Sequence, residues 1–396
     1  MGLWETITLA GSRAAEARSW LTVVPAVDYL RGALDVAELP NGWQRPVRVQ
    51  ESVLRALTSC EANHPGLFRQ MASATSGMCL RLATDASELA VAVRLDREPR
   101  GTADVLEACE RVGGRRPYDG VSCWVDGRRL GCQTPRLPQR ALPWLGDVGG
   151  MGIACFDLRD PKSEPGEGVM ALPGLGKRHE VCIWLPCLRG CDLRELWLDG
   201  TYVEALPARP SLLVLGDSIG QGFCADDPAG TWPALLAERL GLDLLNQSIG
   251  GQVLQASTIP HVAMGPNDRI VVELGANYRW DPRPRVALEH EVRAYLGGVR
   301  HRWPNTPTWV VTPLWHDEES SASKSADCLQ WVASSLAQAA TEVGARLVEG
   351  AALVDADPAL FADGEHPGPK GHAQMASRLC AKMRHVGKAR RGSRRA

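Results

Sequence analysis

A serine, a histidine and an acid occur in this sequence at positions where a fold could bring them together. Ser218 follows the apolar run Leu212–Leu215 and begins a turn that contains glycine. Asp363 and His366 are three residues apart in a short polar loop near the end of the chain. A serine hydroxyl becomes an effective nucleophile when an imidazole takes its proton and a carboxylate orients that imidazole. These residue types indicate acyl transfer, with Ser218 as nucleophile, His366 as base and Asp363 as orienter.

Two further segments could donate hydrogen bonds to the oxyanion that forms when a serine attacks an ester carbonyl. Gly251 ends a glycine-containing turn and can present its backbone N–H with no side chain in the way. Asn277 follows the apolar run Ile270–Leu274 and would place a side-chain amide at the same sheet edge. Together with the backbone N–H of Ser218, these groups predict an oxyanion hole with three donors.

Each of these residues also has a simpler structural interpretation. Ser218 and Asp217 could be turn or helix N-cap residues, and Asn277 could close the turn after its strand. Cys224 lies near the nucleophile turn but has no separate base, so we interpret it as a packing residue or a pocket wall. His372 falls in the first turn of the last predicted helix, where we expect a solvent-facing or capping side chain.

The elements that must position these residues follow from the pattern after Pro207, where apolar strands alternate with longer segments of helical period. Buried strands that alternate with helices predict βαβ units on a parallel sheet covered on both faces. Ligands bind such sheets outside the carboxyl ends of the strands, where the candidate residues lie. The predicted strands are Leu212–Leu215, Leu242–Leu245, Ile270–Leu274, Thr308–Val311 and Arg346–Val348, and the predicted helices are Trp232–Leu240, Arg285–Arg302, Asp327–Val343 and Gly371–Val386.

In the first half of the chain, apolar residues recur with a period near two in short runs such as Met78–Thr84, Glu88–Asp96 and Glu180–Pro186. This pattern predicts antiparallel strands, and we expect a β-sandwich of jelly-roll type. The proline-rich segment Ala205–Pro210 has the composition of a linker. We therefore predict a sandwich domain over residues 1–207, a catalytic α/β domain over 208–387 and a basic disordered tail over 388–396.

Composition argues against several classes of protein and of site. The chain has 396 residues, and its 44 Lys and Arg against 46 Asp and Glu give a net charge of −2, which offers no field to attract nucleic acid or an anionic membrane. It lacks both a membrane-spanning apolar run and a signal-peptide pattern, which predicts a soluble cytoplasmic protein whose 12 cysteines are reduced. Without a Cys-x-x-Cys motif we expect no metal site, and we expect no cofactor.

Taken together, the four segments resemble the four sequence blocks of the SGNH (GDSL) hydrolase superfamily, and they stand in that family's order. The resemblance extends over roughly residues 211–386. Tyr278 stands where the family carries an aspartate, but the oxyanion donor Asn277 is in place. The four blocks are Gly216–Ser218, Gly251, Gly275–Tyr278 and Asp363–Pro367.

This resemblance implies a three-layer α/β/α catalytic domain of flavodoxin type and a serine esterase or acyltransferase activity. It implies the roles of nucleophile, base and acid for Ser218, His366 and Asp363, and those of oxyanion donors for Ser218, Gly251 and Asn277. The N-terminal half is more loosely similar to the sandwich domains that precede the catalytic domain in some carbohydrate esterases and in an acyltransferase of tetracycline biosynthesis.

We therefore expect a serine esterase that hydrolyses O-acyl esters, in particular O-acetyl esters, of a carbohydrate or glycoside. The alternatives are acyl transfer to the hydroxyl of a small molecule and a non-catalytic carbohydrate-binding protein. Aromatic side chains can stack on sugar faces, so Trp280 and Trp315 are candidate substrate-binding residues, together with Asp217 beside the nucleophile. The sequence does not indicate an oligomeric state.

Overall fold

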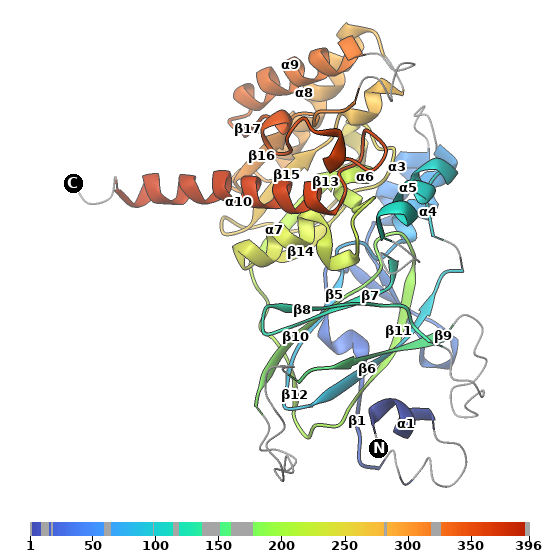
Figure 1. The fold of residues 1–396 in the computed structure, drawn as a ribbon. Coiled ribbons are helices and arrows are strands. Elements are labelled where there is room, and N and C mark those ends of the chain that lie inside the picture. The colour runs from blue at the N-terminus through green and yellow to red at the C-terminus, as the bar shows by residue number, and fades with distance from the viewer. Residues whose placement is uncertain are drawn as a thin grey trace.

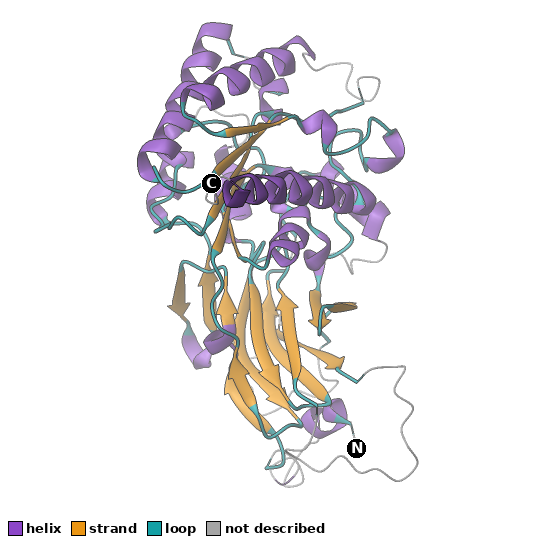
Figure 2. Ribbon diagram, turned by 90° about the vertical axis from the view of Figure 1, so that its left-hand side faces the viewer, coloured by secondary structure: helices purple, strands orange, loops and turns teal. Residues whose placement is uncertain are grey.

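The computed structural model describes residues 2–8, 16, 19–58, 65–97, 99–113, 119–136, 151–159, 177–280, 283–317 and 326–392. Its strands form two antiparallel sheets in the N-terminal part and one parallel sheet in the C-terminal part. In Figures 1 and 2 the antiparallel sheets lie at one end of the molecule, and the parallel sheet with its helices lies at the other. The predicted α/β fold, with an antiparallel first part and a parallel second part, is confirmed.

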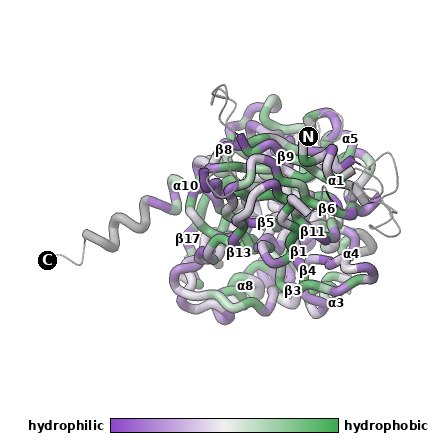
Figure 3. The backbone as a smooth tube through the Cα atoms, turned by 90° about the horizontal axis from the view of Figure 1, so that it is seen from below, coloured by the Kyte–Doolittle hydropathy of each residue, from purple (hydrophilic) through white to green (hydrophobic). Residues whose placement is uncertain are grey.

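The two antiparallel sheets share one core because alternate side chains of their strands face each other. Val91 and Val93 of one sheet and Leu80 and Leu82 of the other are fully buried in it. Figure 3 shows apolar stretches that alternate with polar ones along the chain in this part. In spatial order, the first sheet has β3 (Asp35–Glu38), β4 (Gln44–Val47), β11 (Cys191–Leu198), β6 (Glu88–Leu95) and β9 (Met151–Asp157), with β1 (Thr22–Pro25) paired to β11. The second has β12 (Val203–Ala205), β5 (Cys79–Thr84), β10 (His179–Trp184), β7 (Val121–Val125) and β8 (Arg128–Gln133), with β2 (Leu30–Arg31) paired to β5.

The parallel sheet brings the ends of three adjacent strands to one edge. Its spatial order is β14 (Asp243–Asn246), β13 (Ser211–Gly216), β15 (Arg269–Glu273), β16 (Thr308–Val311) and β17 (Arg346–Val348). In chain order this is 2-1-3-4-5, the doubly wound order of flavodoxin-like folds, which bind ligands at the switch point between the first and third strands. Gly216 at the end of β13 is in register with Glu273 at the end of β15.

Four helices cover the two faces of the parallel sheet: α7 (Trp232–Leu240), α8 (Arg285–Arg302), α9 (Ala326–Glu342) and α10 (Pro369–Gly392). The pattern of apolar residues predicts α7 and α8 to the residue, and it predicts α9 with a shift of one residue. Alternate strand residues face opposite layers. Leu213 and Val272 pack in one core with α8 and α9, and Val214 and Val271 pack in another with α7 and α10.

Helix α10 extends away from the rest of the molecule in Figure 1 and runs to Gly392. It therefore includes the first residues of the predicted tail, and residues 393–396 lie outside the described part of the chain, so the disorder of the tail stays a prediction. None of the helices that the structure describes, α10 included, has the length and apolar character needed to cross a bilayer.

Three helices of the N-terminal part were not predicted: α3 (Glu51–Thr58), α4 (Pro65–Ser73) and α5 (Ala103–Gly113). In Figure 1 they lie close to α6 (Ser218–Gln221). Val53, Phe68 and Cys109 from these helices are buried in the same core as residues of the parallel sheet. The prediction of a sandwich is therefore incomplete: it was based on the runs of period two in this half, and the helical period of the three segments between those runs was overlooked. A further short helix, α1 (Leu3–Thr8), packs on the first sheet.

The segment 206–210 joins β12 of the second sheet to β13 of the parallel sheet and contains the predicted domain boundary. A nearly buried ion pair connects the two parts beside this segment, with Arg81 Nη1 2.6 Å from Asp243 Oδ1. Arg209 donates its backbone N–H to Asp243 Oδ2 at 2.9 Å. Asp243 therefore ties β14, the linker and the second sheet together.

Candidate active site

Ser218 lies at the sharp turn between β13 and α6. Asp217 is the N-cap of α6, and its Oδ1 accepts the N–H of Ile219 at 3.0 Å. Gly222 ends the helix with a φ of 103°, a conformation that glycine adopts without strain. The cap partners an N–H that would otherwise be free, which allows the helix to begin directly after the strand. Ser218 is half-buried while its neighbours are buried, so the turn presents the serine at the carboxyl edge of the sheet.

The loop before α10 brings His366 to Ser218. His366 Nε2 lies 2.8 Å from Ser218 Oγ, and His366 Nδ1 lies 2.8 Å from Asp363 Oδ2. Asp363 Oδ1 accepts the backbone N–H groups of Glu365 at 3.0 Å and of His366 at 2.7 Å. With the proton of the neutral imidazole on Nδ1, the ring donates to Asp363 and accepts from the Ser218 hydroxyl. The structure thus brings the three predicted side chains into one hydrogen-bonded chain.

The charges of Asp363 and His366 stabilise each other. Burial lowers the pKa of His366, but the charge of Asp363 and its hydrogen bond outweigh burial and raise the pKa to about 9. Burial raises the pKa of Asp363, but the charge of His366 and the hydrogen bonds to the carboxylate bring it well below its ordinary value. At neutral pH the resting site therefore holds an imidazolium paired with a carboxylate.

Turnover should increase with pH, because only the neutral imidazole can accept the Ser218 proton. Below its pKa of about 9, the neutral fraction of His366 grows about tenfold for each pH unit. We expect kcat/KM, which reports the pKa of the free enzyme, to follow this increase when measured from about pH 6 to about pH 10. Glu365→Gln should move the midpoint to lower pH, since Glu365 raises the pKa of His366. A profile that is flat above neutral pH would contradict a raised pKa.

The predicted oxyanion donors Gly251 and Asn277 lie in the loops after β14 and β15. Gly251 has a φ of 82°, and its N–H makes no hydrogen bond within the described part of the chain. Asn277 lies in a 3-10 turn, Ala276–Arg279, and its Nδ2 donates to the carbonyl of Gln252 at 3.1 Å. This bond fixes the amide and leaves its second N–H for a ligand, because a primary amide has two N–H donors.

Residues 214–374 match the sequence profile of a family described as the GDSL-like Lipase/Acylhydrolase family. The C-terminal part therefore contains a GDSL/SGNH lipase-acylhydrolase domain. No curated protein matches the chain.

The fold of the whole chain, sandwich and GDSL domain together, is similar to solved structures of low sequence identity. A salicylyl-acyltransferase from a tetracycline biosynthetic pathway has 21% identity and a TM-score of 0.66, with 93% of this chain and 98% of that chain covered. A putative GDSL-like lipase from Bacteroides ovatus has 14% identity and a TM-score of 0.65 over the same shares of the two chains. A family two carbohydrate esterase from Cellvibrio japonicus has 13% identity and a TM-score of 0.54, with 92% and 98% covered. The likeness shows a shared two-part architecture.

Asn277→Ala should lower kcat by roughly 10²–10³ with KM almost unchanged, because a bond to the oxyanion strengthens only in the transition state. If Asn277 only closes the turn through its bond to Gln252, the variant should instead lose thermal stability and keep a near-normal kcat. Measurement of kcat, KM and melting temperature on the same variant decides between the two roles.

Tyr278 of the GDSL domain, in the position of the family's aspartate, supports the Asn277 loop from the side of α8. The Tyr278 side chain is fully buried, and its hydroxyl donates to Glu291 Oε2 at 2.6 Å. Arg283 Nη1 lies 2.6 Å from the other oxygen of Glu291. Where the family carries an aspartate, this chain therefore has a tyrosine whose hydroxyl connects the loop to α8.

The three predicted substrate-binding residues differ in their surroundings. Trp280 is 45% exposed, and its Nε1 lies 3.4 Å from Glu365 Oε1, beside the catalytic loop. Trp315 is partly buried and packs on Phe361, with 5.1 Å between ring centroids. The polar loop that follows it falls, from residue 318 to 325, outside the described residues. Asp217 is fully buried and caps α6, so its role is structural and it has no surface for substrate.

Cys224 is a packing residue beside the site. Its Sγ lies 3.6 Å from Cys109 Sγ of α5, and both side chains are buried. The hydrogen bond to Cys109 and burial both raise the pKa of the Cys224 thiol far above its ordinary value, so it stays neutral and is a poor nucleophile. Cys224, Asp363 and His366 offer ligand atoms within 4.8 Å of one another, but Asp363 and His366 are hydrogen-bonded to each other, and His366 is also hydrogen-bonded to Ser218.

His372 is fully buried, so the expectation of a solvent-facing side chain is wrong and the capping alternative applies. Its Nδ1 accepts the N–H of Trp232, the first residue of α7, at 3.1 Å. Its Nε2 donates to the carbonyl of Phe223 at 2.8 Å. Burial lowers the pKa of His372 to about 4, so the ring is neutral and joins α10, α7 and the segment after α6.

Sequence analysis missed Arg48, a residue of the N-terminal part that binds the loop after β14, which leads to Gly251. The side chain is fully buried, and burial lowers its pKa to about 9. Its donors bind main-chain carbonyl groups on both sides of the contact between the two parts. No local pattern identifies this role, because the residues it joins are 200 positions apart. The acceptors are the carbonyls of Ala74 at 3.1 Å, Asn246 at 3.0 Å, Ser248 at 2.6 Å and Met71 at 3.0 Å.

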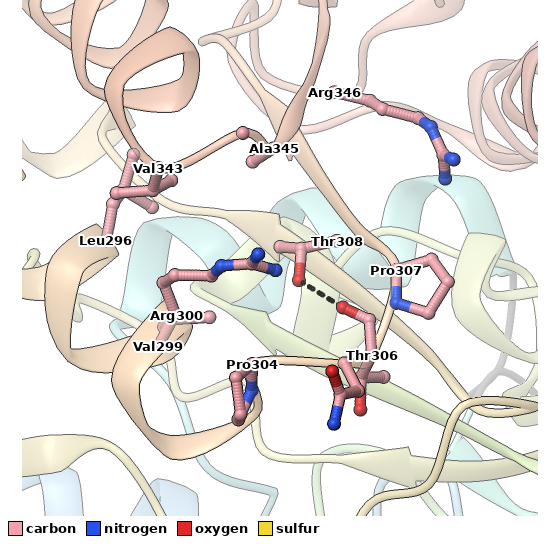
Figure 4. A pocket seen from close by; sticks show the side chains of 12 residues that line it. Leu296, Val299, Arg300, Pro304, Thr306, Pro307, Thr308, Val343, Ala345 and Arg346 are labelled. Carbon is pink, nitrogen blue, oxygen red and sulfur yellow. Dashed lines mark hydrogen bonds between the residues drawn. The ribbon is translucent and has the colours of Figure 1, made fainter.

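A surface pocket of about 360 Å³ lies at the opposite edge of the parallel sheet. Figure 4 shows Arg300 and Thr308 among the residues that line it. Thr308 and Arg346 begin β16 and β17, whereas Ser218 follows the carboxyl end of β13. The pocket is therefore separate from the candidate active site and contains none of its residues.

Proposed function

We propose that this protein is a serine esterase that acts on O-acyl esters of a carbohydrate or glycoside. The observation that carries the proposal is the chain of two 2.8 Å contacts from Ser218 through His366 to Asp363. It lies at the carboxyl edge of a doubly wound sheet, where such folds bind ligands. The match of residues 214–374 to the lipase and acylhydrolase family supports the same class of chemistry.

In this proposal His366 Nε2 takes the hydroxyl proton while Ser218 Oγ attacks the ester carbonyl. The oxyanion that forms accepts hydrogen bonds from the backbone N–H groups of Ser218 and Gly251 and from the Asn277 amide. The imidazolium then gives its proton to the departing alcohol, which leaves an acyl group on Ser218. A water molecule repeats the sequence on the acyl-enzyme and releases the acid. Asp363 stabilises the imidazolium in both halves of the reaction.

The loop that contains Gly250 and Gly251 is in contact with the N-terminal part. A Cβ atom on Gly251 would lie 3.5 Å from Phe68 Cε1, and one on Gly250 would lie 3.3 Å from Met71 Cε. Helix α4 of the N-terminal part therefore forms a wall against this loop. The exposed ring of Trp280 beside the catalytic loop offers a stacking surface for a sugar. A structure of similar fold is a family two carbohydrate esterase.

An ester screen with the purified protein tests this proposal. We expect turnover of acetyl esters, including acetylated sugars, that falls as the acyl group lengthens to butyryl and beyond. A fluorophosphonate probe should label the wild type, because it reacts with an activated serine. A protein that binds carbohydrate without catalysis would show neither turnover nor labelling, and that result would contradict the proposal.

Acyl transfer to an alcohol is the second candidate function. It is favoured by the 0.66 TM-score of the fold against a salicylyl-acyltransferase. The same acyl-enzyme serves both reactions, and the choice depends on whether an alcohol or water reaches it. Addition of small hydroxyl compounds to the ester assay separates them: an acyltransferase forms a new ester at the expense of free acid, and an esterase releases acid throughout.

A further inference from the structure

A cluster of buried polar side chains lies beneath the nucleophile turn and takes no part in the proposed reaction. It comprises Asp217, Ser248 in the loop after β14, and Glu273 at the end of β15. The three residues are 0%, 0% and 5% exposed. Asp217 Oδ2, Ser248 Oγ and Glu273 Oε2 have no hydrogen-bond partner among the residues that the structure describes. Three orphaned buried oxygens at one place need a physical explanation.

The cluster presses against the backbone on both sides of Ser218. A Cβ atom on Gly216 would lie 2.7 Å from Ser248 Oγ and 2.9 Å from Glu273 Oε2. A Cβ atom on Gly220 would lie 2.4 Å and 3.1 Å from the same two oxygens. The carboxyl group of Glu273 therefore fills the space between the strand end and α6. The backbone N–H groups of Asp217 and Gly220 lower the pKa of this carboxyl group.

An ionised pair of carboxylates does not fit this place. Ionised carboxylates only accept hydrogen bonds, so neither could donate one to the other. Two like charges at close range in an apolar site also repel each other, which disfavours ionisation of both groups. The charged groups that act on Asp217 are His366, which lowers its pKa, and Glu365, which raises it, and the one that acts on Glu273 is Asp217. The buried guanidinium of Arg48 also contacts the Ser248 loop. It donates to the main-chain carbonyls of Asn246 and Ser248 and not to the carboxyl groups.

Burial, and to a lesser degree the charge of Asp217, raise the pKa of Glu273 well above its ordinary value, against the opposing effect of the two backbone N–H groups. Burial also raises the pKa of Asp217 to about 7, although its bond from Ile219 and the charge of His366 lower it. The direction of both pKa shifts agrees with the arrangement of oxygens. Of the two carboxyl groups, Glu273 is the one that we expect to stay protonated.

We propose that Glu273 is a positioning residue that keeps its proton at neutral pH and acts as a neutral carboxyl group wedged beneath Ser218. Its O–H supplies a donor that two ionised carboxyl groups at this place would lack. The neutral state also keeps a second negative charge away from the oxyanion. The catalytic part of this inference rests on the proposed esterase function, whereas the protonation of Glu273 does not.

Two substitutions separate a neutral carboxyl group from an ionised one. Glu273→Gln keeps a neutral group of the same shape with both a donor and an acceptor, so kcat should stay within a few-fold of the wild type. Glu273→Leu removes both, and the loosened turn should lower kcat by roughly 10²-fold with KM little changed. At pH values above the range in which His366 loses its proton, the wild type should lose activity as the Glu273 proton dissociates, and Glu273→Gln should lack that loss.

A second measurement needs no substrate. A carboxyl group whose folded pKa is raised binds more protons in the folded state than in the unfolded state, so its contribution to stability falls as pH rises above about 4.3. The free energy of unfolding of Glu273→Gln relative to the wild type should therefore increase when denaturation is measured from about pH 5 to about pH 8. The control is Glu342→Gln, a half-exposed carboxylate 3.6 Å from Arg293, for which the difference should not change in this way.

Two results would overturn the proposal. Loss of kcat in Glu273→Gln as large as in Glu273→Leu would show that the ionised carboxylate is required. A stability difference for Glu273→Gln that is constant with pH would show that Glu273 is ionised in the folded protein. If the wild type turns over no ester, the proposed function fails, but the stability measurement still decides the protonation state. If Glu273→Leu does not fold, Glu273→Gln and the stability measurement remain sufficient.

Discussion

Replacement of Ser218 by alanine should abolish ester turnover, with a loss of kcat on the order of 10⁶. The reason is that Ser218 Oγ is the atom held 2.8 Å from the imidazole, and no other hydroxyl among the described residues is bonded to this ring. The melting temperature should change little, because the side chain is half-buried and carries no core packing. Initial rates on an acetyl ester and thermal unfolding of the same preparation measure both effects. The variant should also lose its reaction with a fluorophosphonate probe.

The matched control for this variant is Cys224→Ala, because Cys224 is the other potential nucleophile near His366. Its thiol is buried and neutral, so turnover should depend on it only through the packing against Cys109. Retention of most activity in Ser218→Ala, together with its loss in Cys224→Ala, would contradict the assignment of the nucleophile and transfer it to the thiol.

Replacement of His366 by alanine should be nearly as damaging, again with a loss on the order of 10⁶ in kcat, because the serine then has no base and the leaving alcohol has no acid. Asp363→Ala should cost less, on the order of 10⁴, because the carboxylate only orients the ring and stabilises its charge. Asp363→Ala should also lower the pKa of His366, since the Asp363 carboxylate is what raises it against burial.

The pH profiles of Asp363→Ala and His366→Ala test whether the acid acts through this histidine. The residual rate of Asp363→Ala should reach its plateau at lower pH than the wild-type rate, whereas that of His366→Ala should show no dependence on a histidine. His366→Ala also removes a buried ring that lies 5.8 Å from Phe223, so its melting temperature must be measured alongside. An unchanged wild-type profile in Asp363→Ala would contradict the pairing of the acid with this histidine.

The elements of the parallel sheet could be predicted because their sequence signals are local. Buried strands and amphipathic helices repeat over few residues, so the bounds of α7 and α8 follow from the pattern alone. The placement of Ser218, His366 and Asp363 follows from the fold, since the ends of parallel strands share one edge. A short spacing also suffices for the bond from Asp363 to His366, because both lie in one loop.

The contribution of the N-terminal part could not be predicted, because it consists of contacts between distant segments. The wall formed by Phe68 and the carbonyl contacts of Arg48 depend on how the sandwich docks on the catalytic half. Asp217 was assigned to substrate because it adjoins the nucleophile, and only the three-dimensional turn shows that its side chain is turned inward. The protonation of Glu273 likewise depends on which oxygens surround it in the folded state.

From the bonds of Arg48 to Asn246 and Ser248 we expect the active site to become functional late in folding. These bonds close loops of 198 and 200 residues, and contacts so distant in sequence form late because the entropy of closing the loop must be overcome first. The parallel sheet can therefore form from contacts between segments that are closer in sequence, while the loop that carries Gly251 has not yet reached its native conformation. During synthesis the ribosome releases Arg48 long before Ser248, so the arginine that fixes this loop is already available when the loop emerges. When the full-length chain refolds from denaturant, this order of synthesis is lost. We therefore expect enzyme activity to recover more slowly than secondary structure.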